Sequence, residues 1–262
     1  MRRATALAAV ALAAALSLAG CSSDSDDGAA PASLPVSTTG APSTSPTSAP
    51  LAGQFARPTP LPPTVTCAYP PSAQAVRPVS PPPTANISTQ GIATVTLDTS
   101  VGDIGLNLDR ALAPCTVNSM VSLSTQGYFD DTPCHRLVTS GIYVLQCGDP
   151  TGKGNGGPGY VYANEYPTDL YQANDPALST SVNYPRGTVA MANTGKPSSN
   201  GSQFFLVYQD SPLPPTYTVV GSISEPGLAT LDKVAAGGDD GSISAGGGAP
   251  KTTVTIEKAT AS

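Results

Sequence analysis

The stretch from Gly187 to Val207 most constrains what this chain can fold into, because it predicts two short strands joined by a turn. Its middle, Asn193–Gly201, is rich in the turn-forming residues Gly, Pro, Ser and Asn, and the runs on either side are apolar. Since side chains alternate along a strand, Phe204 and Phe205 are expected to point to opposite faces. One phenylalanine would then fill the core, and the other would line a surface pocket able to bind an extended peptide.

Periodic patterns elsewhere predict more strands and two short helices. Thr116–Gln126 carries apolar side chains at helical spacing, and Pro114 stands just before it, where a first helical turn tolerates proline. The other expected elements are a hairpin at residues 92–99 and 103–108, strands at 213–223 and 251–258, and a second helix at 228–235.

The distribution of proline separates a stalk from a domain. Of the 262 residues, 28 are Pro, 26 are Gly and only 11% are charged, and fifteen of the prolines lie between Pro31 and Pro83. Low hydrophobicity there cannot offset the entropy of ordering, so we expect polyproline II character. The expected organisation is a signal peptide at 1–20, a stalk at 21–85 whose end (about 64–85) is a candidate for docking, and a domain at 86–262.

The N-terminus has the layout of an export signal. Met1–Arg3 is basic, and the uncharged Ala- and Leu-rich run up to Gly20 is too short to make a good membrane span. The run ends in Leu18-Ala-Gly-Cys21, which resembles the lipobox of bacterial lipoproteins, where the signal is cut before a cysteine that is then lipidated. We therefore expect a lipid anchor at Cys21 on the outer face of the plasma membrane. An ordinary cleaved signal followed by a chance cysteine is the alternative.

The remaining cysteines, Cys67, Cys115, Cys134 and Cys147, are an even set in a chain expected to reach an oxidising compartment, which favours two disulfides. Cys67 would fasten the end of the stalk to the domain. A metal site is the competing interpretation. Because the chain has no CxxC spacing and a single histidine, His135, we expect no metal.

Strand alternation argues against pairing Cys134 with Cys147. If a regular strand runs from Cys134 to Arg136, those two side chains point the same way, whereas Cys147 points opposite to its neighbour Gln146. The two cysteines would then lie on different faces of the sheet. We therefore expect each to pair with one of the other two cysteines.

The charge balance argues against nucleic acid as a partner. The net charge is −6 at pH 7, and no basic patch with interleaved aromatic side chains is present in the sequence. The glycine-dense segment at 152–159 lacks the GK[ST] ending and the following helical pattern of a phosphate-binding loop. We interpret it as a surface loop.

Four short motifs carry a family resemblance. The chain contains Met191-Ala-Asn-Thr-Gly195 and Asn200-Gly-Ser-Gln-Phe-Phe205, with Cys134-His-Arg136 and Leu145-Gln-Cys-Gly-Asp149 upstream. Together they resemble the cyclophilin family of peptidyl-prolyl isomerases over roughly residues 86–258. The resemblance implies a mainly β fold, a closed antiparallel eight-stranded barrel capped by two short helices.

The resemblance also implies a peptide site that needs neither metal nor cofactor. Arg136 would supply a cation that stabilises the twisted Xaa-Pro amide, and Gln146 would orient it and contact the substrate. Phe205 would form the floor of a slot for the proline ring. The other residues implied are Tyr143 and Val144 on one side of the slot, Leu213 on another, Ala192 and Asn193 for backbone contacts, and Gln203 and Tyr217 for substrate binding.

These assignments predict a monomeric, lipid-anchored peptidyl-prolyl cis-trans isomerase that acts on Pro-containing peptides and unfolded exported proteins and assists their folding. Two other functions stay open. One is a module of the same fold that binds Pro-containing envelope proteins without turnover, and the other is a structural lipoprotein without a peptide site. For Arg136 taken alone, a surface salt bridge is the ordinary alternative.

Overall fold

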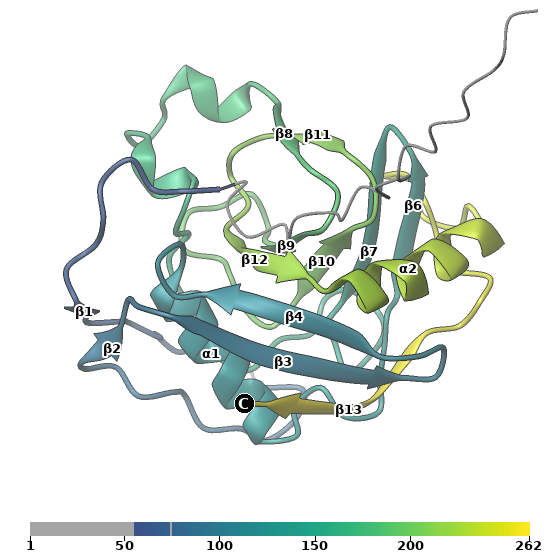
Figure 1. Ribbon diagram of the computed structural model, residues 1–262, viewed down its shortest axis with the longest axis horizontal. Coiled ribbons are helices and arrows are strands. Elements are labelled where there is room, and N and C mark those ends of the chain that lie inside the picture. Colours follow the sequence, from purple (N-terminus) through teal and green to yellow (C-terminus); the bar gives the residue numbers. More distant parts are fainter. Residues whose placement is uncertain (1–54, 74) are drawn as a thin grey trace, which may run out of the picture. The chain divides into compact units, whose positions relative to one another are not determined.

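A curled antiparallel sheet organises the part of the chain that the computed structural model describes, residues 55–73 and 75–262 (Figure 1). Alternation builds its strands: Val95 and Leu97 are buried on one face of β3, while Asp98 between Leu97 and the strand end is exposed. In spatial order, the nine strands are β5 (Thr132–Pro133), β13 (Thr255–Ala261), β3 (Ile92–Thr99), β4 (Ile104–Asp109), β12 (Val219–Ile223), β9 (Thr188–Met191), β10 (Phe204–Val207), β7 (Ile142–Cys147) and β6 (Arg136–Ser140).

The expected closed eight-stranded barrel is therefore wrong. The sheet has nine strands and is open, because its edge strands β5 and β6 do not pair with each other. Instead, the outer edge of β6 is bridged by a loop: the Leu137 amide donates to the Gly248 carbonyl at 2.8 Å, and the Gly248 amide donates to the Leu137 carbonyl at 3.0 Å. The mainly β architecture with two helices agrees with the prediction.

Helix α1 (Pro114–Thr125) begins at the proline that the sequence places at its first turn. The partly buried carboxylate of Glu165 accepts hydrogen bonds from the Cys115 and Thr116 amides at 3.0 and 2.7 Å, which satisfies free donors at the helix start. Burial raises the pKa of Glu165, although the hydrogen bonds from Thr116 and Cys115 oppose this. Helix α1 lies behind β3 and β4 in Figure 1 and contacts β13 and β3.

Helix α2 (Glu225–Gly237) is capped at both ends. The Ser224 side chain accepts a hydrogen bond from the Gly227 amide, and Gly238 ends the helix with φ at 72°. In Figure 1 the helix passes in front of the sheet, where it contacts β4. Both helices match predicted ones: α1 begins two residues earlier and ends one residue earlier than expected, and α2 is longer at both ends, by three and two residues.

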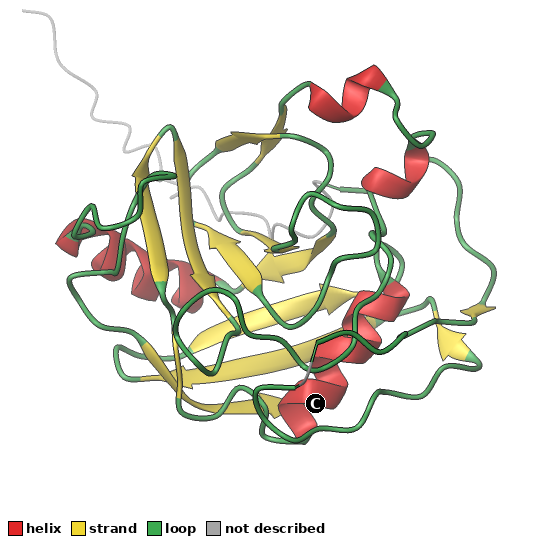
Figure 2. Cartoon of the chain, turned by 180° about the vertical axis from the view of Figure 1, so that it is seen from behind, coloured by secondary structure: helices red, strands yellow, loops and turns green. Residues whose placement is uncertain are grey.

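The predicted strand at 213–223 is two separate strands, β11 (Ser211–Leu213) and β12. Pro214 and Pro215 lie between them, and a residue without an amide hydrogen cannot continue a ladder. Strand β11 pairs with β8 (Val182–Tyr184), and this small sheet joins the 3-10 helices η1 (Thr168–Leu170) and η2 (Pro176–Ser179) in a lobe beyond the main sheet (Figure 2).

The N-terminal segment that precedes the sheet packs mainly on helix α1. Strand β1 (Thr64–Val65) pairs with β2 (Ile87–Ser88), and Cys67 is joined to Cys115 of α1. The Tyr69 hydroxyl donates to the Cys115 carbonyl at 2.8 Å, and Arg77 donates to the Tyr128 carbonyl at 2.9 Å. Residues 67–73 and 75–83 thus lie against α1 and the turn that follows it.

The expected disulfide pairing is wrong. Cys134 is bonded to Cys147, and Cys67 to Cys115, as expected for the cysteine that fastens the N-terminal segment. The alternation argument assumed a regular strand from Cys134 to Arg136. The Cys134 amide instead donates to the Val254 carbonyl at 2.8 Å, and β6 begins only at Arg136, so the alternation does not continue through this turn.

The expected signal peptide, the expected lipidation site Cys21 and the expected stalk up to residue 54 lie outside the described residues. In the described ranges, no helix has the length and apolar character needed to cross a membrane. The same ranges hold no group of three or more His, Cys, Asp or Glu side chains placed to bind a metal ion.

Candidate active site

A cavity of about 190 Å³ lies at the face of strands β7 and β10, beside the start of β6. The strands bring together residues far apart in the sequence, and the lining is apolar on the floor and walls with an arginine and a glutamine at one end. We call this cavity the slot; its lining residues are Arg136, Ile142, Val144, Gln146, Ala192, Asn193, Phe205, Leu213 and Tyr217.

Strand pairing fixes the polar end of the slot. Arg136 of β6 stands directly opposite Gln146 of β7, and Gln146 stands opposite Phe205 of β10. Directly opposed residues in an antiparallel sheet share a face, so the guanidinium, the amide and the aromatic ring point to the same side.

Alternation along β7 decides which of its residues reach the slot. Ile142, Val144 and Gln146 line it, whereas Tyr143 points to the other face and packs edge-on against Tyr208 at 6.0 Å between ring centroids. The assignment of Tyr143 to the slot is therefore wrong, because neighbours on a strand cannot both face the same cavity. The same rule applied from Val144 would have found Ile142.

Phe205 forms the floor, as the resemblance implied. Its ring meets Tyr217 edge-on at 5.5 Å and lies 6.5 Å from the ring of the fully buried Tyr184. Phe204, on the opposite face, is fully buried against Phe129 in the main core. The predicted division of the two phenylalanines between core and pocket is confirmed.

The Arg136 guanidinium is held by neutral acceptors. Its Nε and Nη2 donate to the Gly246 carbonyl at 3.1 and 3.0 Å, and Nη2 also approaches the Ala245 carbonyl at 3.4 Å. Its Nη1 approaches Oε1 of Gln146 at 3.5 Å. Among the described residues the ion pairs are Arg57 with Asp169 and Arg186 with Asp232, so the surface salt bridge considered for Arg136 is not formed there.

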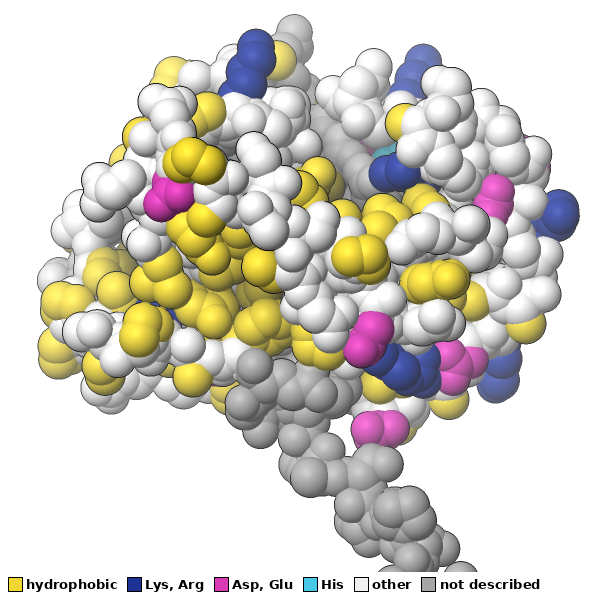
Figure 3. All heavy atoms as spheres, turned by 90° about the horizontal axis from the view of Figure 1, so that it is seen from above, with side chains coloured by type: hydrophobic (Ala, Val, Ile, Leu, Met, Phe, Trp, Pro, Cys, Tyr) yellow, Lys and Arg dark blue, Asp and Glu magenta, His cyan; other side chains and the backbone are white. Residues whose placement is uncertain are grey.

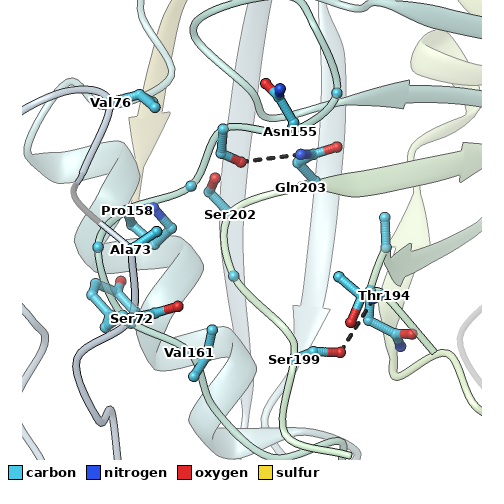
Figure 4. A pocket seen from close by; sticks show the side chains of 18 of the residues that line it. Ser72, Ala73, Val76, Asn155, Pro158, Val161, Thr194, Ser199, Ser202 and Gln203 are labelled. Atoms are coloured by element: carbon cyan, nitrogen blue, oxygen red, sulfur yellow. Dashed lines mark hydrogen bonds between the residues drawn. The ribbon is translucent and has the colours of Figure 1, made fainter. Parts of the chain in front are cut away.

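Two further amides extend this network away from the slot. Gln146 Nε2 donates to Oε1 of Gln203 at 2.9 Å, and Gln203 Nε2 donates to the Gly156 carbonyl at 3.0 Å, the dashed line at Gln203 in Figure 4. Gln203 therefore fixes Gln146 and does not line the slot. A chain of oriented amides holds the side chain that faces Arg136.

A second cavity of about 260 Å³ adjoins the slot and shares Gln146, Ala192 and Asn193 with it. In Figure 4, Ser72, Ala73 and Val76 of the N-terminal segment lie on one side, and Thr194 and Ser199 of the turn after β9 lie on the other. The sequence reasoning missed this wall, since the N-terminal segment carries no motif that points to the site.

The backbone contacts expected at Ala192 and Asn193 are partly taken by the chain itself. The Ala192 amide donates to the Gln203 carbonyl at 3.0 Å, so this donor holds the turn in place. The Asn193 side chain donates to the Thr216 carbonyl at 2.8 Å and accepts from the Gly195 amide at 2.9 Å. Both residues still line the slot, at its border with the second cavity.

Asp149 shapes the glycine-dense segment beside these cavities. Its buried carboxylate accepts hydrogen bonds from the amides of Thr151, Asn155 and Gly156 at 2.8 to 3.0 Å. Burial by itself would raise the pKa of Asp149, but the hydrogen bonds from Gly156, Thr151 and Asn155 outweigh it and lower the pKa below its usual value. The segment is thus an ordered surface loop, as predicted.

Charged side chains are few on one face of the molecule. On the face of the molecule in Figure 3, charged side chains are sparse among apolar and uncharged ones, and no large patch of a single sign is present. Arg136 is the charged residue among those that line the slot.

Comparisons with known proteins agree with this geometry. Residues 94–261 match the family described as cyclophilin type peptidyl-prolyl cis-trans isomerase/CLD. The chain is 60% identical over 167 residues to the probable peptidyl-prolyl cis-trans isomerase B of Mycobacterium leprae, covering 63% of this chain and 55% of the relative. For its counterpart from Mycobacterium tuberculosis, the identity is 59% over 166 residues, covering 62% and 52%. The chain thus spans about half the length of these curated relatives.

Solved structures agree as well. A cyclophilin type isomerase from Cryptosporidium parvum is similar with a TM-score of 0.54 and 29% identity, covering 66% of this chain and 98% of that one. The region that matches the family model, residues 94–261, contains the slot, both helices and all of the main sheet except the first two residues of β3. This chain belongs to the family of cyclophilin-type peptidyl-prolyl cis-trans isomerases.

Proposed function

We propose that this protein is a peptidyl-prolyl cis-trans isomerase that accelerates rotation about Xaa-Pro bonds in exported or envelope proteins and assists their folding. The observation that carries the proposal is the slot itself, in which an arginine without an ion pair among the described residues stands beside an apolar floor sized for a small ring. The name of the two mycobacterial relatives supports the same activity.

The reaction demands little covalent chemistry. The barrier to rotation about a peptide bond is about 18–20 kcal/mol, and uncatalysed Xaa-Pro exchange takes tens of seconds. An acceleration of about a million-fold requires roughly 8 kcal/mol of preferential binding of the twisted state. No nucleophile or redox group is needed for this.

Different residues of the slot can bind the proline ring and stabilise the twisted amide. Phe205, Leu213 and Val144 would hold the proline ring by apolar contact. Arg136 would then face the prolyl nitrogen, which becomes pyramidal and basic as the amide twists. Because neutral carbonyls and an amide hold the guanidinium, its positive charge stays available to that nitrogen.

Arg136 is the residue that tests the proposal. We expect Arg136→Ala to lower kcat by two to three orders of magnitude, which is about 3–4 kcal/mol, as for the loss of one preorganised donor. Affinity for the peptide should fall much less, because the interaction forms mainly in the twisted state. The measurement is exchange of a short Ala-Pro peptide by NMR; a related Cryptosporidium parvum isomerase was crystallised in the presence of the Ala-Pro dipeptide.

Arg110→Ala is a suitable control, since Arg110 lines a separate small cavity beside α1. Full exchange activity in folded Arg136→Ala protein would contradict the catalytic assignment. Peptide binding by wild type without accelerated exchange would leave the binding module as the function, and no binding of any Xaa-Pro peptide would leave a structural lipoprotein.

We also propose that Cys21 is lipidated and anchors a monomeric domain at the outer face of the plasma membrane. The support is the Leu18-Ala-Gly-Cys21 sequence after a basic and apolar leader. Two or more acyl chains hold a soluble domain durably at a membrane, whereas one does not. Cys21→Ala should therefore release the protein, and quantitative sedimentation of this variant with salt-washed membranes would contradict the anchor.

A further inference from the structure

The loop between α2 and β13, residues 239–250, lies along the outer edge of β6 and reaches the candidate catalytic arginine. We propose that this loop is a positioning element for isomerisation: the Ala245 and Gly246 carbonyls hold the Arg136 guanidinium in its working orientation. The proposal rests on the proposed function, in which Arg136 stabilises the twisted amide. It assigns a role to a segment that carries no motif.

The loop is fixed to β6 at several points. Leu137 exchanges two backbone hydrogen bonds with Gly248, at 2.8 and 3.0 Å. Farther along the strand, the Thr139 hydroxyl donates to the Asp239 carboxylate at 2.7 Å. Because Leu137 directly follows Arg136, the loop is anchored one residue away from the side chain that it contacts.

The loop is also stiffened from within. The Asp240 carboxylate accepts hydrogen bonds from the Ser242 amide at 3.0 Å and the Ala249 amide at 2.9 Å, which joins the two ends of the loop. At its tip, the Ile243 amide donates to the Gly247 carbonyl at 3.0 Å, and the Gly246 amide donates to the Ile243 carbonyl at 2.9 Å. The tip is therefore a closed turn that presents the Gly246 carbonyl at a defined place.

Glycine at 247 permits the close approach. Its φ of 75° lies in the left-handed region, and a Cβ added there would stand 2.1 Å from the Leu137 carbonyl oxygen. Any larger residue would push the tip away from β6 and from Arg136. By contrast, a Cβ at Gly241, with φ at 66°, would meet nothing within 4 Å.

The choice of acceptor has a consequence for catalysis. A carboxylate would orient the guanidinium equally well but would neutralise its charge, whereas a carbonyl dipole orients it and leaves the net charge in place. The Gly246 carbonyl accepts hydrogen bonds from Nε and Nη2 of Arg136, and Nη1 faces Gln146. The guanidinium plane is thus set from two sides, one of which is the loop.

The test compares Gly247→Ala with Gly241→Ala in the full chain. Both substitutions place alanine at a positive φ in the same loop, so the backbone strain is matched and only the collision with Leu137 differs. We expect Gly247→Ala to lower kcat on the Ala-Pro peptide about ten-fold or more with little change in KM, and Gly241→Ala to lower it less than two-fold. Equal kcat values for the two variants would overturn the proposal.

A double-mutant cycle separates positioning from general damage. If the loop acts through Arg136, Gly247→Ala should cost nothing further in kcat when Arg136 is already alanine. The same loss of kcat in both backgrounds would mean that the loop supports the fold alone, and the proposal would fail.

A readout without turnover distinguishes failure of this proposal from failure of the proposed function. The Arg136 Nε–H signal, assigned by its disappearance in Arg136→Ala, should be protected from solvent exchange in wild type and Gly241→Ala but not in Gly247→Ala. An unprotected signal in wild type would show that the loop does not hold the guanidinium, whatever the activity. A protected signal with no peptide isomerisation would contradict the proposed function, and with it the catalytic purpose of the contact.

Discussion

The two disulfides close loops of very different length, and this predicts which one stabilises the protein more. Cys67–Cys115 spans 48 residues of sequence, and Cys134–Cys147 spans 13. In the loop-entropy description, the restriction of the unfolded chain contributes about 4 kcal/mol for the first and about 3 kcal/mol for the second at 25 °C. We use Cys→Ala pairs, because a serine in place of the buried Cys67 would bury a hydroxyl.

The expected loss of about 4 kcal/mol in Cys67→Ala/Cys115→Ala corresponds to a fall in Tm of about 8–16 °C for a domain of this size. Urea unfolding of both double variants and wild type, under oxidising conditions, gives the free energies of unfolding, and thermal melts give the Tm values. Exchange activity of Cys67→Ala/Cys115→Ala should be unchanged, because neither Cys67 nor Cys115 lines the slot. In Cys134→Ala/Cys147→Ala, kcat should fall, since the bond flanks both Arg136 and Gln146.

The decisive outcome is which double variant loses more free energy of unfolding. If Cys134→Ala/Cys147→Ala loses more stability than Cys67→Ala/Cys115→Ala, loop length does not control the effect. A loss below about 1 kcal/mol for the longer loop would mean that the contacts of Tyr69 and Arg77 hold the N-terminal segment without the covalent bond.

Two other substitutions test the floor of the slot and the cap of α1. Phe205→Ala should cost about 3–5 kcal/mol of stability, because the ring is nearly buried, and should raise KM more than ten-fold, as measured by urea unfolding and peptide exchange. Burial raises the pKa of Glu165 above its usual 4.5, so its contribution to stability is present at low pH and lost as pH rises through the folded-state pKa. The free energy of unfolding of wild type should therefore fall relative to Glu165→Gln between pH 4 and pH 7, and a difference independent of pH would contradict this.

Local rules applied to single strands predicted much of the site correctly. Alternation placed Phe204 in the core and Phe205 at the pocket, and β10 has that arrangement. The family resemblance implied that Gln146 orients Arg136, and the register of β6 with β7 places the two residues directly opposite each other. These predictions succeed because each depends on one regular strand or one pair of neighbouring strands.

The same rule failed where the chain is not regular. Cys134 lies between β5 and β6, and its amide donates to the carbonyl of Val254, the residue before β13, so its direction does not follow from that of Arg136. Tyr143 was assigned to the slot from the resemblance although alternation from Val144 excludes it. Gly246 and Arg136 are 110 positions apart, and Gly246 contacts the guanidinium through its backbone carbonyl. A pattern of side chains in the sequence therefore cannot predict this contact.

The open sheet and the held arginine are consequences of one feature. Had the sheet closed, the outer edge of β6 would have been paired with another strand along its length, and the loop at 239–250 could not have bridged Leu137. An edge strand must find partners for its free amides and carbonyls, and here a glycine-rich loop supplies them at Gly248. Because Arg136 is the neighbour of Leu137 on that edge, the loop that satisfies the backbone also brings the Gly246 carbonyl to the guanidinium. Completion of the sheet edge and orientation of the candidate catalytic cation are therefore performed by the same few residues.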